Sequence, residues 1–162
     1  MTVFNYFPRK EDLFFDREDE GRMLAEEALL DRGEGVAPIN ALHALIHRLA
    51  EERHPFAWFD IRTARFRRTM NASPALSARA REILDELARD IARMLAREAG
   101  ERAARPRTRL AASMLVAAWS VAQEEGHGTF SRSGRSDAAR AAFLSVIDSA
   151  FAAARVIDGT AT

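Results

Sequence analysis

Residues 73–100 read SPALSARAREILDELARDIARMLAREAG, and this stretch decides the fold class. Ser73 followed by Pro74 is a strong helix start, because serine accepts a hydrogen bond from a free backbone N–H and proline tolerates the first helical position. Gly100 supplies a stop. Between them, apolar residues recur at helical spacing, which predicts a long helix with one buried face. That apolar stripe consists of Leu76, Ala80, Ile83, Leu84, Leu87, Ile91, Met94 and Leu95.

The rest of the chain repeats this pattern of apolar helical stripes divided by proline, glycine and serine. We find no strand-like alternation and no hairpin signal, so the sequence predicts an all-α fold. Gly126 is expected to end the sixth helix, with a loop up to Ser136, and the tail 158–162 is expected to fray. The other expected helices span residues 2–6, 10–30, 38–54, 56–70, 106–125 and 137–157.

Composition limits the class of protein. The chain has 162 residues, which suffices for one domain with a sizeable core. Its 24 basic and 24 acidic residues balance, which argues against a whole-surface nucleic-acid binder but permits a local basic patch. Cysteine is absent, which excludes disulfides and thiolate zinc sites. No apolar run approaches the roughly 20 residues that span a bilayer. We therefore expect a cytoplasmic protein, away from membranes, without a cofactor.

The last two expected helices are apolar over more than half of their circumference and rich in alanine. A helix of this kind is buried on two sides. Two interpretations follow: a two-fold interface of four helices between two copies, or a buried hairpin within one monomer. The first predicts a homodimer whose interface contains Leu115, Ala118, Ala122, Phe143, Ile147, Ala150 and Ala154.

The N-terminal stretch, residues 1–13, reads MTVFNYFPRKEDL. It resembles the end of the DNA-binding domain in transcription factors of the tetracycline-repressor family. There a recognition helix runs through Thr-x-[Tyr/Phe]-x-Tyr-Phe, breaks, and is followed by a helix that opens with Lys-Glu/Asp. The resemblance implies that residues 1–13 are a remnant of a helix-turn-helix domain. It also implies that residues 14–157 form an all-α ligand-binding and dimerisation domain, which in this family dimerises through its last two long helices.

The same resemblance assigns DNA contacts to five residues. Thr2 would bind a phosphate or a base edge, and Asn5 a base or a phosphate. Phe4 stands where the family usually has tyrosine and would pack on a thymine methyl or the sugar backbone. Tyr6 would bond a phosphate, and Lys10 would add charge at the start of the next helix. Alternatively, the aromatic residues form a plug beneath the fold, which is the better interpretation for Phe7.

The sequence lacks the helices that precede this signature in the family. One turn of isolated helix is not stable in water. We therefore expect this chain by itself to bind operator DNA weakly or not at all, and operator binding to belong to a full-length form.

Regulators of this family usually bind a small molecule inside the helical body. The stretch from Arg62 to Ala80, with Asn71–Leu76 at its centre, resembles a Ser/Thr-Pro-Ala-Leu helix start in a subgroup with acyl-CoA-like ligands, which implies a small apolar or amphipathic effector. Aromatic residues and methionines at helical spacing fit an adaptable pocket wall, but they more often belong to a plain core. The pocket candidates are Trp58, Phe59, Phe66, Met70, Met94, Met114 and Trp119.

Charged and imidazole side chains offer weaker signals. An arginine run over residues 62–68 would receive an anionic ligand or DNA, or is a solvated face. His43 and His47 have metal-compatible spacing, but no carboxylate or third histidine lies at a telling distance, so we predict no metal. We see no catalytic constellation and predict no enzyme. The leading hypothesis is a ligand-responsive transcriptional regulator, usually a repressor; the alternative is a stand-alone helical dimer that binds a small molecule and no DNA.

Overall fold

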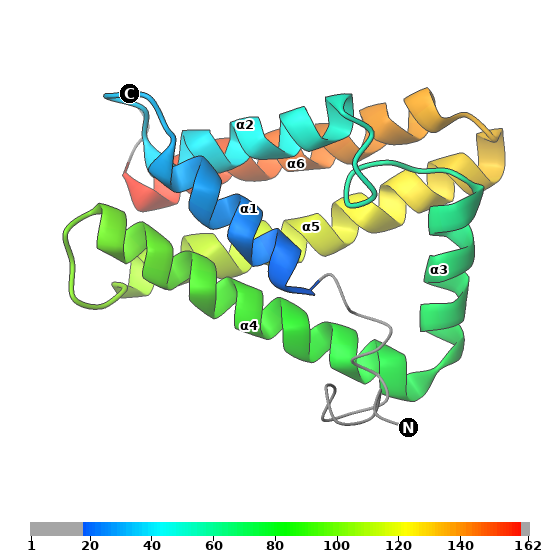
Figure 1. Cartoon of the computed structure of the whole chain (residues 1–162), viewed down its shortest axis with the longest axis horizontal. Helices are drawn as coiled ribbons and strands as arrows, with labels where there is room; N and C mark the ends of the chain where they lie inside the picture. Colours follow the sequence, from blue (N-terminus) through cyan, green and yellow to red (C-terminus); the bar gives the residue numbers. More distant parts are fainter. Residues whose placement is uncertain (1–17, 160–162) are drawn as a thin grey trace, which may run out of the picture.

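The computed structural model describes residues 18–159, and every regular element in that range is an α-helix (Figure 1). This confirms the all-α prediction. The predicted DNA-contact residues 2–10 and the tail 160–162 lie outside the described range. The helices are α1 (Glu18–Leu30), α2 (Pro38–Glu51), α3 (Ile61–Ala72), α4 (Pro74–Glu98), α5 (Pro106–Ser133) and α6 (Ser136–Asp158).

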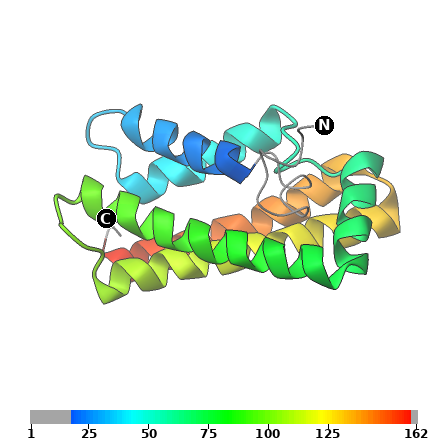
Figure 2. The same cartoon turned by 60° about the horizontal axis from the view of Figure 1, so that its bottom comes forward.

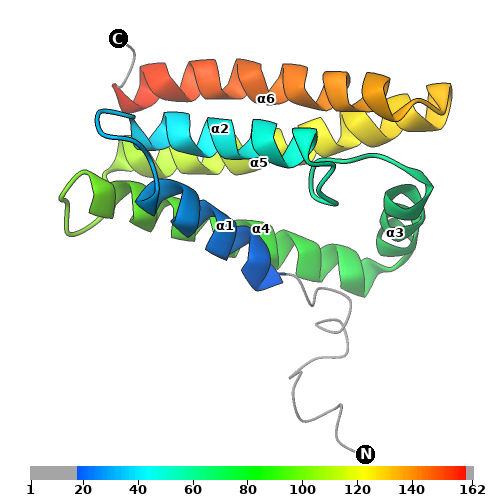
Figure 3. The same cartoon turned by 45° about the horizontal axis from the view of Figure 1, so that its top comes forward.

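The helices form a bundle built around the last two. α5 and α6 run antiparallel and pack together along most of their length, and α4 lies against α5. α2 lies beside α6, while α1 bridges α2 and α4 (Figures 2 and 3). α3 stands across one end of the bundle and leads directly into α4. This order leaves α5 and α6 together along one side of the molecule.

Helix α4 begins as the sequence predicts. Ser73 caps it by accepting a hydrogen bond from the backbone N–H of Leu76 at 3.3 Å, and Pro74 is its first residue. Gly100, with φ of 69°, follows its end in the left-handed conformation. The apolar stripe is buried only towards the C-terminal half of the helix, at Met94 and Leu95. The first half of the stripe, next to α3, is only half-buried.

Helix α3 starts later than predicted, at Ile61 instead of residue 56. Asp60 forms a capping box: its carboxylate accepts from the backbone N–H groups of Arg62 at 2.8 Å and Thr63 at 2.9 Å. The Thr63 hydroxyl accepts in return from the Asp60 backbone N–H at 2.9 Å. Because the cap satisfies the first free N–H groups, the helix begins there and the preceding residues form a connecting segment.

Helix α5 continues past Gly126 to Ser133, so the predicted stop at Gly126 is wrong. Gly134, with φ of 65°, caps the C-terminal end of the helix. Gly126 is buried, and the Phe59 ring lies directly on it: a Cβ there would stand 2.3 Å from Phe59 Cζ. This glycine therefore serves close packing inside the helix rather than ending it.

The core runs through the α5–α6 hairpin and beneath α1 and α2. Its largest fully buried side chains include Phe59, Phe143 and Ile147. Phe143 on α6 contacts the Phe59 ring at a centroid distance of 5.5 Å and the Trp119 ring at 5.3 Å. Five predicted interface residues belong to this core, namely Leu115, Ala122, Phe143, Ile147 and Ala154. Their assignment to a dimer interface is wrong, because their own chain already covers them.

Candidate functional site

The structure places the predicted pocket residues in different parts of the molecule, some in the core and some at or near α3. Phe59 is fully buried and borders no space for a ligand, so its assignment to a pocket wall is corrected to core. Met94 is nearly buried and borders only a small surface hollow lined mainly by charged side chains. Met114 and Trp119 also pack against the core. The remaining three lie at the α3 end or near it: Trp58 beneath the Arg53 guanidinium at 4.9 Å, Phe66 at 46 % exposure, and half-buried Met70.

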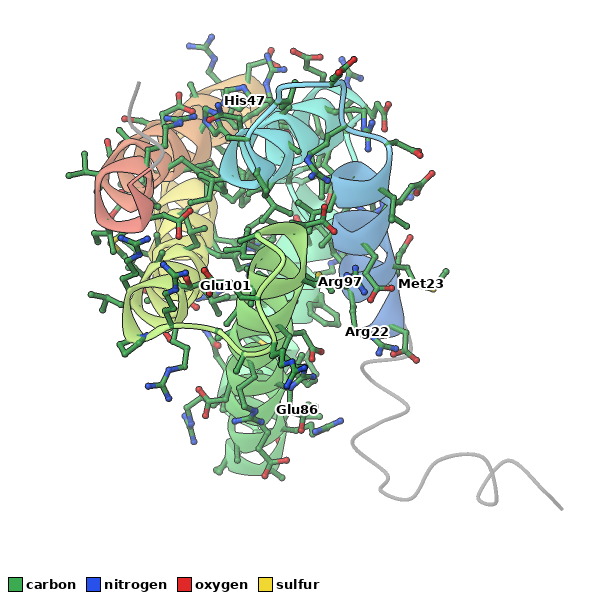
Figure 4. The ribbon with its side chains drawn as sticks, turned by 90° about the vertical axis from the view of Figure 1, so that its left-hand side faces the viewer. Arg22, Met23, His47, Glu86, Arg97 and Glu101 are labelled. Carbon is green, nitrogen blue, oxygen red and sulfur yellow. The ribbon has the colours of Figure 1, made fainter. Side chains whose placement is uncertain are left out.

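Two small hollows lie on the described surface, the first lined mainly by charged side chains and the second by a mixture of charged and apolar ones. One, of about 250 Å³, lies between α1 and α4, where Figure 4 shows Arg22 and Arg97. The other, of about 200 Å³, lies near the start of α5 and includes Glu101 and Arg107. Of the predicted pocket residues only Met94 borders either hollow. Both hollows are smaller than the roughly 300 Å³ at which pockets for drug-sized ligands begin.

His127 on α5 is a polar group that sequence reasoning missed. Its ring meets the Phe59 ring edge-on at 5.1 Å, and within the described part of the chain its buried Nδ1 has no hydrogen-bond partner. Burial, followed by the positive charge of Arg67, lowers the pKa of His127 to about 4. The imidazole is therefore neutral at pH 7 and offers an unused polar atom in apolar surroundings. Arg67 itself pairs with Glu124 at 3.6 Å.

A second unpredicted arrangement joins α2 to α6. His43 and His47, one turn apart on α2, both place Nε2 at 2.7 Å from the same oxygen, Oδ1 of Asp148 on α6. Asp148 is 105 residues from His43 in sequence. The expectation that no carboxylate accompanies the two histidines is therefore wrong. Figure 4 shows His47 at the α2 side of the molecule that faces α6.

The contact with Arg155 assigns the tautomer of His43. Nη2 of Arg155 lies 3.0 Å from Nδ1 of His43, and Nε of Arg155 donates to Oδ1 of Asn40 at 2.6 Å. A guanidinium only donates, so Nδ1 of His43 accepts and the ring proton sits on Nε2, directed at Asp148. The His43 ring also stacks on Phe151 at 4.9 Å. His43 is thus held on three sides, and the arrangement is a hydrogen-bonded link between two helices.

The charge state of Asp148 follows from these contacts. Burial raises the pKa of Asp148, but the hydrogen bonds that the carboxylate accepts from His47 and His43 outweigh burial and lower the pKa below its ordinary value. Asp148 is therefore ionised at pH 7. Within the described residues, these three side chains are a group whose ligand atoms all lie within 4.8 Å of one another.

Comparison of the chain with protein-family models, with curated proteins and with solved structures found no match. Within residues 18–159 no helix has the length and apolar character needed to cross a membrane.

Proposed function

We propose that this chain is the effector-binding and dimerisation body of a ligand-responsive transcriptional regulator of the tetracycline-repressor type. The N-terminal signature, residues 1–13, supports the lineage, and the order of helices, ending in a long antiparallel pair, agrees with such a body. The observation that carries the proposal is the outer face of α5 and α6. It bears apolar and small residues that remain uncovered in a single chain.

On α5 the uncovered stripe consists of Leu110, Ser113, Ala117 and Val121, which all lie on one side of the helix by their spacing and are exposed. On α6 the exposed stripe is Ala141, Ser145, Ser149, Ala152 and Val156. Figure 4 shows the two helices side by side along one side of the molecule, opposite α1. Small residues allow close helix approach, so we assign the homodimer interface to these outer stripes in place of the buried residues named from sequence.

The effector site belongs, in this proposal, where α3 crosses the end of the bundle. Here the first half of the α4 stripe is only half-buried, at Leu76, Ile83, Leu84 and Leu87. α3 contributes no buried residue, although it packs on α4. His127 adds, near Arg67 of α3, a buried ring nitrogen that has no hydrogen-bond partner among residues 18–159. Half-buried apolar side chains beside one neutral polar group suit contact with a small apolar or amphipathic ligand.

Trp58 and Trp119 provide the assay for the effector site. We expect acyl-CoA thioesters of increasing chain length to change the tryptophan fluorescence of the purified chain and to raise its melting temperature. Leu84→Ser should weaken the response, whereas Leu110→Ser, on the outer face of α5, should not. Equal responses of both variants, or none from the unmodified chain, would contradict this location.

The coding frame upstream of residue 1 distinguishes the regulatory role from the alternative, a stand-alone dimer that binds a small molecule. If that frame supplies the preceding helices of a DNA-binding domain, the extended protein should retard its own promoter DNA in a gel and release it with effector. A stop codon with no such helices would favour the alternative.

A further inference from the structure

We propose that His43, His47 and Asp148 form a binding site for one transition-metal dication of the zinc class. This site lies on α2 and α6, and it does not depend on the proposed regulatory role. Two imidazoles and a carboxylate are a donor set that binds zinc, with water in the fourth position.

The positions of the ligand atoms suit such an ion. A tetrahedral zinc with bonds of about 2.0 Å holds its ligand atoms about 3.3 Å apart. Each Nε2 lies 2.7 Å from Oδ1 of Asp148, and the three ligand atoms lie within 4.8 Å of one another. An ion therefore needs the carboxylate to withdraw by less than about 1 Å and the two imidazole nitrogens to approach each other by no more than about 1.5 Å. His43 and His47 are one helical turn apart and converge on one point, which fixes two ligands on a rigid element. All three side chains reach solvent, so an ion can enter.

Arg155 opposes the ion through His43. To bind a metal at Nε2, His43 must carry its proton on Nδ1, the atom that now accepts from Arg155. A metal-bound histidine normally donates its second N–H to a hydrogen-bond acceptor, and a guanidinium cannot accept a hydrogen bond. Metal binding therefore releases Arg155 from His43, while Asn40 still offers Arg155 an acceptor. The cation of Arg155 also repels the incoming charge. Removing this side chain should consequently strengthen the site.

The site spans two helices, and this gives it a measurable effect on folding. His43 and His47 belong to α2, whereas Asp148 lies in the middle of α6. An ion that binds the folded arrangement and not the unfolded chain raises the melting temperature as its concentration exceeds its dissociation constant. Imidazole ligands favour Zn²⁺, Ni²⁺ and Cu²⁺ over Mg²⁺, so Mg²⁺ should leave the melting temperature unchanged.

The test uses calorimetric titration of the intact chain with ZnCl₂ at pH 7.5, with Co²⁺ absorption as a probe of coordination. We expect one ion per chain, tetrahedral Co²⁺ bands, and loss of more than about tenfold in affinity in His47→Ala and in Asp148→Asn. His54→Ala removes a histidine that lies outside the site, and it should bind zinc as the unmodified chain does. Arg155→Met should bind zinc several-fold more tightly.

Circular dichroism first establishes that each variant is folded. Absence of zinc binding by the unmodified chain would overturn the proposal. So would an Asp148→Asn chain that binds with unchanged affinity, since two histidines alone would then account for the ion. A loss in His54→Ala equal to that in His47→Ala would also overturn it, because binding would then be nonspecific. Unchanged affinity in Arg155→Met would contradict the competition by Arg155.

Discussion

Replacing Gly126 by alanine tests the packing at the centre of the fold. The added Cβ would stand 2.3, 2.4 and 2.8 Å from three atoms of the Phe59 ring. Phe59 is fully buried, and its ring also contacts Phe143 and His127, so it cannot move without shifting the core. Overpacking of this kind costs about 1–3 kcal/mol, and contact at three atoms places Gly126→Ala at or above the upper end. The higher helix propensity of alanine relative to glycine offsets about 1 kcal/mol of this cost.

We therefore expect Gly126→Ala to lower the free energy of unfolding by about 2 kcal/mol, measured by urea denaturation followed by circular dichroism. Gly128→Ala is the matched control on the same helix, because its Cβ would meet only the flexible end of Arg132, at 3.1 Å. That variant should be as stable as the parent or up to about 1 kcal/mol more stable. Phe59→Leu in the Gly126→Ala background should restore part of the loss. Equal stability of Gly126→Ala and Gly128→Ala would refute the reasoning.

Two further predictions concern His127 and Asp60. The pKa of His127 is lowered to about 4 in the folded state, so below pH 6.5 the unfolded state takes up a proton that the folded state does not, and stability falls as the pH drops towards 4. After a discount for the partial exposure of the ring, His127 should lower the free energy of unfolding by about 1 kcal/mol between pH 7 and pH 5. In His127→Gln this part of the pH dependence should be absent from urea unfolding curves. An identical pH dependence in both proteins would disprove the prediction. Asp60→Ala deletes the cap of α3 and should cost about 1 kcal/mol, whereas Asp60→Asn, which keeps an accepting oxygen, should cost less; equal losses would show that the cap contributes nothing specific.

Local signals in the sequence predicted much of the helical order. The Ser73-Pro74 start of α4 and the apolar stripe behind it required no tertiary information. The start of α3 was also readable, since Asp60 and Thr63 have the spacing of a capping box, but the apolar residues 56–59 outweighed that signal. These errors concern boundaries, where competing local preferences are nearly equal.

Tertiary contacts decided what the sequence could not. By its residue type Gly126 is expected to end a helix, but Phe59, which precedes it by 67 residues, packs on it within α5. An apolar helix face does not show which surface covers it, so from sequence alone Phe143 and Ile147 fit a dimer interface as well as a core. Asp148 joins His43 only because α2 and α6 lie side by side. No spacing rule connects positions so far apart.

The oligomeric state is the most direct test of the central claim, that α5 and α6 present an outer dimerisation face. Sedimentation velocity of the unmodified chain should give a species of twice the 18.1 kDa monomer mass. Val121→Glu, at a position that is 50 % exposed, should give a folded monomer, because a buried unpaired charge disrupts an apolar interface. Ile61→Glu, on α3 and 55 % exposed, should remain a dimer. A monomeric unmodified chain, or a Val121→Glu chain that still dimerises, would contradict the account.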